Sequence, residues 1–327
     1  MGRATYTRCM GTMGGHLKDT DLVRGRRTLG DLELILCSDG SFLLDGGAMF
    51  GVVPKTLWQK RIAADADNRV LLGLNSVVVR SGSAVVLIET GLGNKLSAKQ
   101  RQFVENQERL PASLAAAGVR PDEVTHVINT HLHWDHCGWN TTLHSDGRVT
   151  PTFPNARYFA SAGELAHGRL QLDRDKVSYL GPNYDPVIAS GQMTLIDLQG
   201  AGGFTQDDAR LRGPDALPSV TIQTTAEIAP GVWVEMLPGH TETMLAVHIE
   251  SGGEHACYVS DLMPTTRHLD PTWAMGFDLD PLRVIEERKK FLQRAIAGQW
   301  LVLFTHDHQV PAAYLGWDEK GKPECRG

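Results

Sequence analysis

The sequence predicts an α/β protein in which two β-sheets pack face to face and helices cover their outer surfaces. Strand-like segments gather near the beginning and again in the second half of the 327 residues, and helical periodicity accompanies each group. The 42% hydrophobic content is enough for a large core. Because each sheet has to bury an apolar face, two stacked sheets with helices outside form the expected layered arrangement.

The first half of the chain begins with two hairpin patterns. Residues 32–47 read as a hairpin that turns at Ser38, Asp39 and Gly40, and residues 75–91 read as a second hairpin with its turn at 81–83. The elements expected next are two helical pieces within 95–118, broken at Pro111, and a short buried strand at 125–131.

The second half repeats the mixture of strands and helices. Strands are expected at 155–162, 193–198, 227–239, 244–253, 255–261 and 300–307, and helices at 162–172 and 281–299. The 281–299 segment has the clearest amphipathic pattern, and it leads directly into the last of these strands.

The chain shows no internal repeat and no low-complexity linker, so residues 29–327 are expected to form one domain. Residues 1–28 lack clear periodicity and are expected to be a flexible N-terminal extension. Residues 199–220 are rich in Gly, Pro and Asp, which indicates a surface loop or lid.

Composition narrows the classes of function. The formal charge of −6 and the lack of a long Lys/Arg run argue against a nucleic-acid partner. No segment has the roughly 20 apolar residues of a membrane span, and no signal peptide is evident. Five scattered cysteines without CxxC spacing fit a reducing compartment better than a disulfide framework. We therefore expect a cytoplasmic protein that acts on a small molecule.

The strongest chemical signal is the motif HLHWDH at 131–136. His131, His133, Asp135 and His136 follow an apolar strand, and such a turn can direct the first two side chains to one metal ion and the last two to another. Imidazole and carboxylate groups suit zinc and similar divalent ions. Four such groups in six residues would be costly to bury without a ligand, which favours a metal site over a structural role.

One motif cannot complete two coordination spheres, so further ligands are needed. His240, Asp261 and His306 each follow a predicted strand and are the expected partners. Cys137, next to His136, is expected to be a small buried apolar group and not a ligand.

With these seven residues in place, the sequence resembles the metallo-β-lactamase fold hydrolases. Within that family DGGAMFGVVPK, TGLG and SDLMPTT are similar to the branch of quorum-quenching acyl-homoserine lactonases and methyl-parathion-type hydrolases. The resemblance implies a four-layer αβ/βα sandwich that holds two divalent ions, with zinc expected. It implies that one ion is held by His131, His133 and His240. The other ion is then held by Asp135, His136 and His306, and Asp261 bridges the two ions.

Three positions depart from the family pattern. Glu89 stands where an aspartate is usual, so a contact that orients a ligand is lengthened by one methylene. The motif at His240 continues as TETM without the usual second glycine. The tyrosine expected shortly after the bridging Asp261 is absent, which removes one source of carbonyl polarisation.

The implied reaction is attack of a metal-bridging hydroxide on a lactone carbonyl. Asp135 or Asp261 is the candidate for moving the proton. Apolar side chains near the motifs are candidates for the substrate pocket, and the alternative, which is favoured for most of them, is a place in the core: Met49, Phe50, Trp58, Trp134, Trp139, Met263 and Trp273. Arg267 is the cation nearest in sequence to the bridging aspartate.

Other functions remain open from sequence. The alternatives within the fold are hydrolysis of an organophosphate triester, of another ester or of a thioester. The acidic net charge argues against a nuclease of this fold, which would be expected to carry a basic groove. A non-catalytic metal-binding protein would be expected to have lost a ligand, and none is missing. The resemblance also makes a homodimer an expectation.

Overall fold

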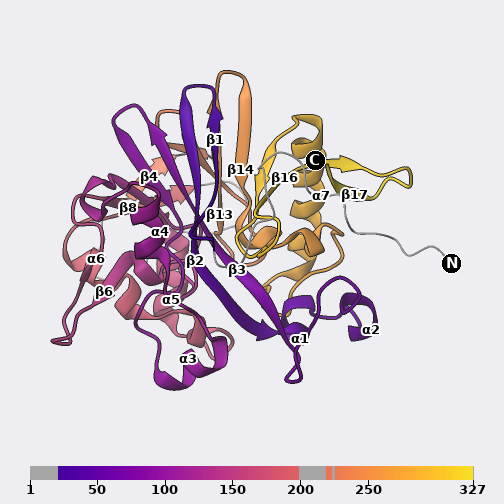
Figure 1. Ribbon diagram of the computed structural model, residues 1–327, viewed down its shortest axis with the longest axis horizontal. Helices are drawn as coiled ribbons and strands as arrows, with labels where there is room; N and C mark the ends of the chain where they lie inside the picture. Colours follow the sequence, from indigo (N-terminus) through magenta and orange to yellow (C-terminus); the bar gives the residue numbers. More distant parts are fainter. Residues whose placement is uncertain (1–20, 199–218, 223–224, 327) are drawn as a thin grey trace.

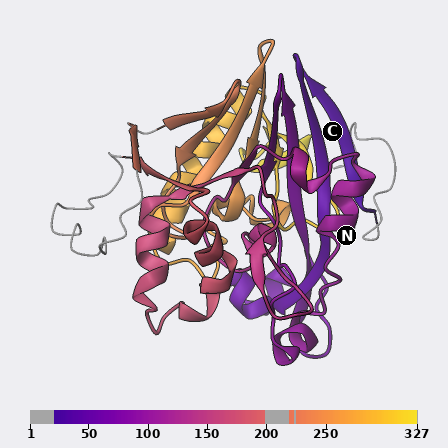
Figure 2. The same ribbon diagram turned by 90° about the vertical axis from the view of Figure 1, so that its left-hand side faces the viewer.

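The computed structural model describes residues 21–198, 219–222 and 225–326. Two large sheets dominate, one with eight strands in the order β1-β2-β3-β4-β5-β8-β9-β10 and one with seven in the order β11 to β17. Figure 2 shows them as two separate sets, indigo to magenta and orange to yellow, lying beside each other. The predicted α/β sandwich is confirmed.

The first sheet is built of β1 Val23–Leu29, β2 Leu32–Asp45, β3 Arg69–Ser81, β4 Ala84–Ile88, β5 His126–Ile128, β8 Arg157–Ser161, β9 Met193–Leu198 and β10 Ser219–Ile222. The second is built of β11 Thr225–Ala229, β12 Val232–Met236, β13 Leu245–Ser251, β14 Glu254–Tyr258, β15 Leu301–Leu303, β16 Ala312–Trp317 and β17 Pro323–Arg326. A small separate hairpin pairs β6 Thr141–Leu143 with β7 Val149–Pro151. The helices are α1 Gly46–Phe50, α2 Lys55–Trp58, α3 Ala98–Val104, α4 Leu110–Ala116, α5 Ala162–Leu170, α6 Asp185–Ala189 and α7 Pro281–Ala297.

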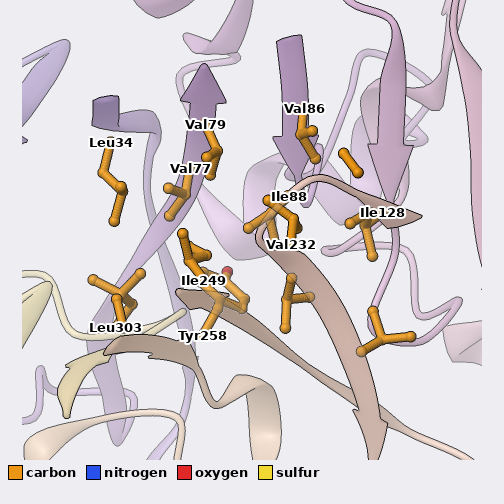
Figure 3. Close-up of a cluster of buried hydrophobic side chains, with 14 of the residues drawn as sticks. Leu34, Val77, Val79, Val86, Ile88, Ile128, Val232, Ile249, Tyr258 and Leu303 are labelled. Carbon is orange, nitrogen blue, oxygen red and sulfur yellow. The ribbon is translucent and has the colours of Figure 1, made fainter. Parts of the chain in front are cut away.

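The central core lies between the sheets and consists of inward-facing aliphatic side chains from both. Figure 3 shows the contributions of the first sheet meeting those of the second: Leu34, Val77, Val79, Val86, Ile88 and Ile128 against Val232, Ile249, Tyr258 and Leu303. Each of these side chains is almost fully buried, and burying one aliphatic side chain of this size stabilises a fold by about 1.5–3 kcal/mol.

The outer faces of both sheets are also buried, because helices cover them. Val78 lies between two inward-facing neighbours and joins a second core with Leu114 of α4 and Leu165 of α5. Beyond the other sheet, Phe291 and Leu292 of α7 pack in a third core. Figure 1 shows α4 and α5 on one flank and α7 on the other, which completes the four layers.

Several boundaries differ from the sequence expectation. Val23–Leu29 form β1 and pair with β2, so the flexible extension expected over 1–28 is wrong for its last residues, because their backbone groups complete the sheet edge. Residues 1–20 and most of the expected lid at 199–220 lie outside the described residues. Residues 32–47 do not form a hairpin, since β2 continues through Ser38 and Ser41 with a local irregularity of register.

The helical break between 95 and 118 lies at 105–109 and not at Pro111. Pro111 belongs to the first turn of α4, where a helix needs no donor from the backbone nitrogen. The hairpin of β3 and β4 and the amphipathic α7 are confirmed. Within the described ranges, no helix combines the length and apolar character needed to cross a membrane.

Candidate metal centre

The seven predicted ligands come from loops that follow strand ends on both sheets. The motif with His131 follows β5 of the first sheet, whereas His240, Asp261 and His306 follow β12, β14 and β15 of the second. Thr130 Oγ1 lies 2.6 Å from Ser260 Oγ, so the loop before the first ligand is bonded to the loop that carries Asp261. The structure therefore brings together side chains up to 175 positions apart, from residue 131 to residue 306.

The first group of ligand atoms is made by three imidazoles. His131 Nε2 lies 3.1 Å from His133 Nδ1, and the latter lies 3.3 Å from His240 Nε2. Asp261 Oδ2 lies 3.4 Å from His240 Nε2. All three rings are at least nine-tenths buried.

The second group shares Asp261 with the first. His136 Nε2 lies 3.3 Å from His306 Nε2. Asp135 Oδ2 lies 3.7 Å from the first of these nitrogens and 3.6 Å from the second. Asp261 Oδ1 lies 3.3 Å from His306 Nε2, and its Oδ2 lies 3.6 Å from His136 Nε2, so this carboxylate contacts both groups.

The donor set fits a pair of divalent cations. Ring nitrogens that converge at about 3 Å cannot all be satisfied by hydrogen bonds to one another, because each neutral imidazole has only one N–H. Asp261 Oδ1 is buried and makes no hydrogen bond among the described residues. Imidazole nitrogen and carboxylate oxygen are the ligands of zinc hydrolase sites, and three overlapping sets of three could hold an ion here: His131, His133 and His240; His131, His136 and Asp261; Asp135, His136 and His306.

The electrostatics of the ligand cluster favour cation binding. Burial, reinforced by the neighbouring imidazoles, lowers the pKa of His131 and His133 well below the usual value, which leaves both rings neutral and able to ligate. Burial would raise the pKa of Asp261, but the surrounding histidines outweigh it and hold the pKa well below its usual range. At His136 burial opposes the charged form, yet three neighbouring carboxylates raise the pKa well above normal. Two cations would replace the proton that this excess of carboxylates attracts.

Oxygen atoms outside the cluster contact three of the rings, two through hydrogen bonds and one through a carboxylate contact. His240 Nδ1 donates to Asp278 Oδ1 over 2.9 Å, and His306 Nδ1 donates to the carbonyl of Gly73 over 3.0 Å. Glu89 Oε2 lies 3.1 Å from His136 Nδ1, so the longer side chain retains contact with a ligand. In each case the other nitrogen, Nε2, is directed into the cluster. Such outer contacts fix the tautomer that a metal requires.

Sequence reasoning missed Asp278 and Phe42. Asp278 lies far from every ligand motif in the chain, and no local pattern marks it. The ring of Phe42 lies 5.3 Å from that of His306 and 6.4 Å from that of Trp134. An inward-facing aromatic residue on a strand carries no signal that distinguishes a core position from one beside a metal centre.

Most of the expected pocket residues belong to the core. Met49, Phe50 and Trp58 are 1% exposed and pack together, and Met263 is fully buried. Trp134 is partly buried against the same core cluster, and its ring lies 6.4 Å from that of Phe42, which in turn lies beside His306. These side chains therefore belong to the hydrophobic core, as the alternative interpretation of the sequence had it, and Trp134 is the exception.

The contacts of Arg267 and Cys137 show what these two residues near the candidate ligands do. Arg267 forms an ion pair with Asp307 over 3.1 Å and also donates to Gln309, so its guanidinium holds the loop after His306. Cys137 is fully buried with its sulfur 3.2 Å from the carbonyl of His133, as expected for a small packed group.

Comparison with known proteins agrees with the geometry. The family model of the metallo-beta-lactamase superfamily matches residues 70–306. A probable metal-dependent hydrolase from Staphylococcus aureus superposes with a TM-score of 0.73 at 27% identity, covering 88% of this chain and 94% of that one. The hydrolase AbOPH of the beta lactamase superfamily gives 0.70 at 19% identity, covering 92% of this chain and 96% of that one.

A third similar structure is AidC, a dizinc quorum-quenching lactonase in complex with the product N-hexanoyl-L-homoserine. It gives a TM-score of 0.68 at 20% identity and covers 94% of this chain and 99% of its own. At such identities the likeness to AidC and AbOPH concerns the fold. Since the family model spans more than half of the sequence and ends on the last predicted ligand, the chain belongs to the metallo-β-lactamase superfamily and is a metal-dependent hydrolase.

Proposed function

We propose that this hydrolase opens the ring of a lactone with an apolar acyl portion, at a centre of two zinc ions held by the seven clustered side chains. The convergence of these seven ligands, with Asp261 in contact with both groups, carries the hydrolytic part of the proposal. A divalent ion pair, when bound, lowers the pKa of a shared water and polarises the carbonyl under attack.

The chain's own groups divide the remaining work. Both oxygens of Asp261 face imidazoles, which suits it to bridging. The Asp135 side chain is 13% exposed, the largest value among the ligands whose side chains form ion contacts here. We therefore assign the proton to the Asp135 carboxylate, which would receive it from the attacking water and return it to the ring oxygen that leaves.

Apolar side chains support a neutral substrate. The ring of Phe42 lies against that of His306, and Trp134 lies against Phe42; Leu180 and Phe277 are partly buried in the same apolar cluster as Phe42. The guanidinium of Arg267, which could otherwise clamp a phosphate or carboxylate, is engaged by Asp307. A lactone with an aliphatic tail meets these conditions, and so does a neutral phosphotriester.

The test has two parts, and the first concerns the metal centre. Elemental analysis of purified active protein should give about two divalent ions per chain, because seven ligands exceed the needs of one tetrahedral site. One ion or none in fully active protein would contradict the dinuclear centre whatever the substrate.

The second part compares kcat/KM for a long-chain acyl-homoserine lactone with that for a neutral phosphotriester. We expect the lactone to be preferred and the phosphotriester to be a side activity. A phosphotriester preference above tenfold, about 1.4 kcal/mol of differential transition-state stabilisation, would reject the lactonase assignment in favour of a triesterase.

A further inference from the structure

A buried carboxylate that is not a ligand lies behind the metal centre. Glu164 belongs to the first turn of α5 and is 1% exposed. Burial raises the pKa of its carboxyl group, so the position opposes ionisation and has to be compensated by hydrogen bonds. Glu164 forms no ion pair with any of the described residues, and the compensation comes from neutral donors on three separate segments.

One oxygen of Glu164 bonds to the segment after His240. Glu164 Oε1 accepts a hydrogen bond from the hydroxyl of Thr241, and Thr243 Oγ1 lies 3.5 Å away from the same oxygen. Thr241 directly follows His240 in the chain, so this bond restrains the backbone at the point where that ligand leaves it.

The other oxygen of Glu164 bonds to the loop of the first motif. Glu164 Oε2 accepts from the backbone N–H of Leu132 over 3.3 Å, and Leu132 stands between His131 and His133. The same oxygen accepts from the hydroxyl of Tyr179 over 3.2 Å. The Tyr179 ring in turn stands edge-on to the His133 ring, with centroids 4.9 Å apart.

We infer that Glu164 is a positioning residue that sets the three histidines of one metal site, His131, His133 and His240, relative to one another. The two ligand segments come from different sheets, and Glu164 is bonded to both. A different buried glutamate lies beside the candidate site of Asp135, His136 and His306. This residue, Glu89, accepts a hydrogen bond from Thr130 N over 2.8 Å and contacts His136. The inference rests on the proposed dinuclear centre.

The hydrogen bonds around Glu164 allow the effect of its bonding geometry to be separated from the effect of its negative charge. A glutamine at position 164 can direct its carbonyl at the donors Leu132 N–H and Tyr179 O–H, which only donate here. Its NH₂ group can then donate to the Thr241 hydroxyl, which is able to accept. Glu164→Gln should therefore keep the arrangement, whereas Glu164→Ala removes it.

The experiment is titration of Co²⁺ into metal-free protein, followed by d–d absorption and by competition with a chelator. In Glu164→Ala we expect the affinity of one of the two ions to fall by about 10- to 100-fold, the usual effect of losing an outer contact to a ligand, and the other to change little. His240→Ala and His306→Ala each disrupt one site and provide the reference spectra that identify which ion is lost.

Three further variants sharpen the test. Glu164→Gln should bind both ions within about threefold of wild type, and Glu286→Ala, at an exposed position on α7, is the matched surface control. Thr241→Val removes one donor without removing the carboxylate and serves if Glu164→Ala does not fold. It should weaken the same ion as Glu164→Ala, by less. Unfolding of each metal-free variant is measured in parallel.

The outcomes are distinguishable. Unchanged binding of both ions in Glu164→Ala, or in Thr241→Val if Glu164→Ala does not fold, would overturn the inference. Equal weakening of both ions would also overturn it, because that is the effect of a generally loosened fold. Loss in Glu164→Gln as large as in Glu164→Ala would assign the effect to charge and reject positioning by shape. Failure of the wild-type protein to bind two Co²⁺ ions would instead reject the proposed centre itself.

Discussion

The contact between His240 and Asp278 allows a sharp test of how the centre is organised, by the substitution Asp278→Asn. One carboxylate oxygen accepts from His240 Nδ1 over 2.9 Å, and the other accepts from the backbone N–H of Met275 over 2.7 Å. Both neighbours donate, so both positions require an acceptor. Asparagine supplies only one carbonyl oxygen, and its NH₂ group has to face one of the two donors.

Either orientation of the asparagine has a cost that can be worked out. If the NH₂ group faces Met275, a buried backbone N–H loses its partner, which costs about 1–3 kcal/mol. If the NH₂ group faces His240, the imidazole must accept at Nδ1 and carry its proton on Nε2, the atom directed at the other ligands. That tautomer cannot bind a cation. In this second orientation we expect metal affinity at the site to fall by about 10- to 100-fold, which is about 1.4–2.7 kcal/mol.

Metal affinity by chelator competition and the free energy of unfolding of the metal-free protein should be measured together. Asp280→Asn is the matched control: Asp280 caps the N-terminus of α7 through Arg283 N, a role that asparagine fills equally well. Asp278→Asn with wild-type affinity for both ions and unchanged stability would refute the proposed role of Asp278 in fixing the tautomer of His240.

Two other substitutions test the bridge and the buried carboxylate of β2. Asp261→Asn should retain the fold by circular dichroism and reduce kcat/KM at least about a hundredfold, since a neutral amide cannot share negative charge between two cations. The control Asp173→Asn, at an exposed position, should have no effect. Near-normal activity of Asp261→Asn with both ions retained would mean that another residue bridges. Burial raises the pKa of Asp39 from 3.8 to about 6, more than the bonds from Leu110 N and Trp139 Nε1 lower it. The carboxyl group of Asp39 therefore binds its proton more tightly in the folded than in the unfolded protein. The protonated group stabilises the fold below about pH 4, and this contribution to the free energy of unfolding, up to about 3 kcal/mol, is lost as the pH rises through about 6. Asp39→Asn lacks this loss, so its deficit in unfolding free energy relative to wild type should shrink between pH 4 and 7; a constant deficit across that range would contradict the raised pKa.

The convergence of the candidate ligands could be predicted from sequence, because metal coordination restricts both residue type and position. His131, His133 and Asp135 are close in the chain, and the distant partners each follow an apolar strand. Loops that follow the strand ends of stacked sheets meet along one edge of the sandwich, so the strand pattern and the residue types together selected candidates that the fold brings close to one another.

The groups that orient the ligands could not be found in this way. Glu164 accepts hydrogen bonds from a backbone N–H and from hydroxyls, and Asp278 accepts from a backbone N–H and from the ring of His240. A carboxylate that accepts from such donors leaves no spacing or composition signal. Its role depends on which segments the fold brings within hydrogen-bonding distance of it, and that is determined by tertiary packing.

The misread hairpin in β2 has a related cause. Ser38, Asp39 and Gly40 have the composition of a turn, and taken alone they favour one. In the folded protein Asp39 instead accepts hydrogen bonds from Leu92 N and Leu110 N, so these distant partners replace the local turn. The strand continues past the bulge as a result. Local propensity was overridden by a buried polar network that no window of the sequence contains.

The position of the centre couples it to the docking of the two sheets. Gly73 N of β3 donates to the carbonyl of His306 over 2.9 Å, and Leu245 N of β13 donates to the carbonyl of Thr130 over 2.8 Å. Each of these bonds joins a ligand loop of one sheet to a strand of the other. Ions held by ligands from both loops would cross-link the sheets and bind only the folded chain, so they would stabilise it by RT ln(1 + [M]/Kd). Because the ligand groups already converge through these backbone bonds, binding would need little rearrangement of the sandwich.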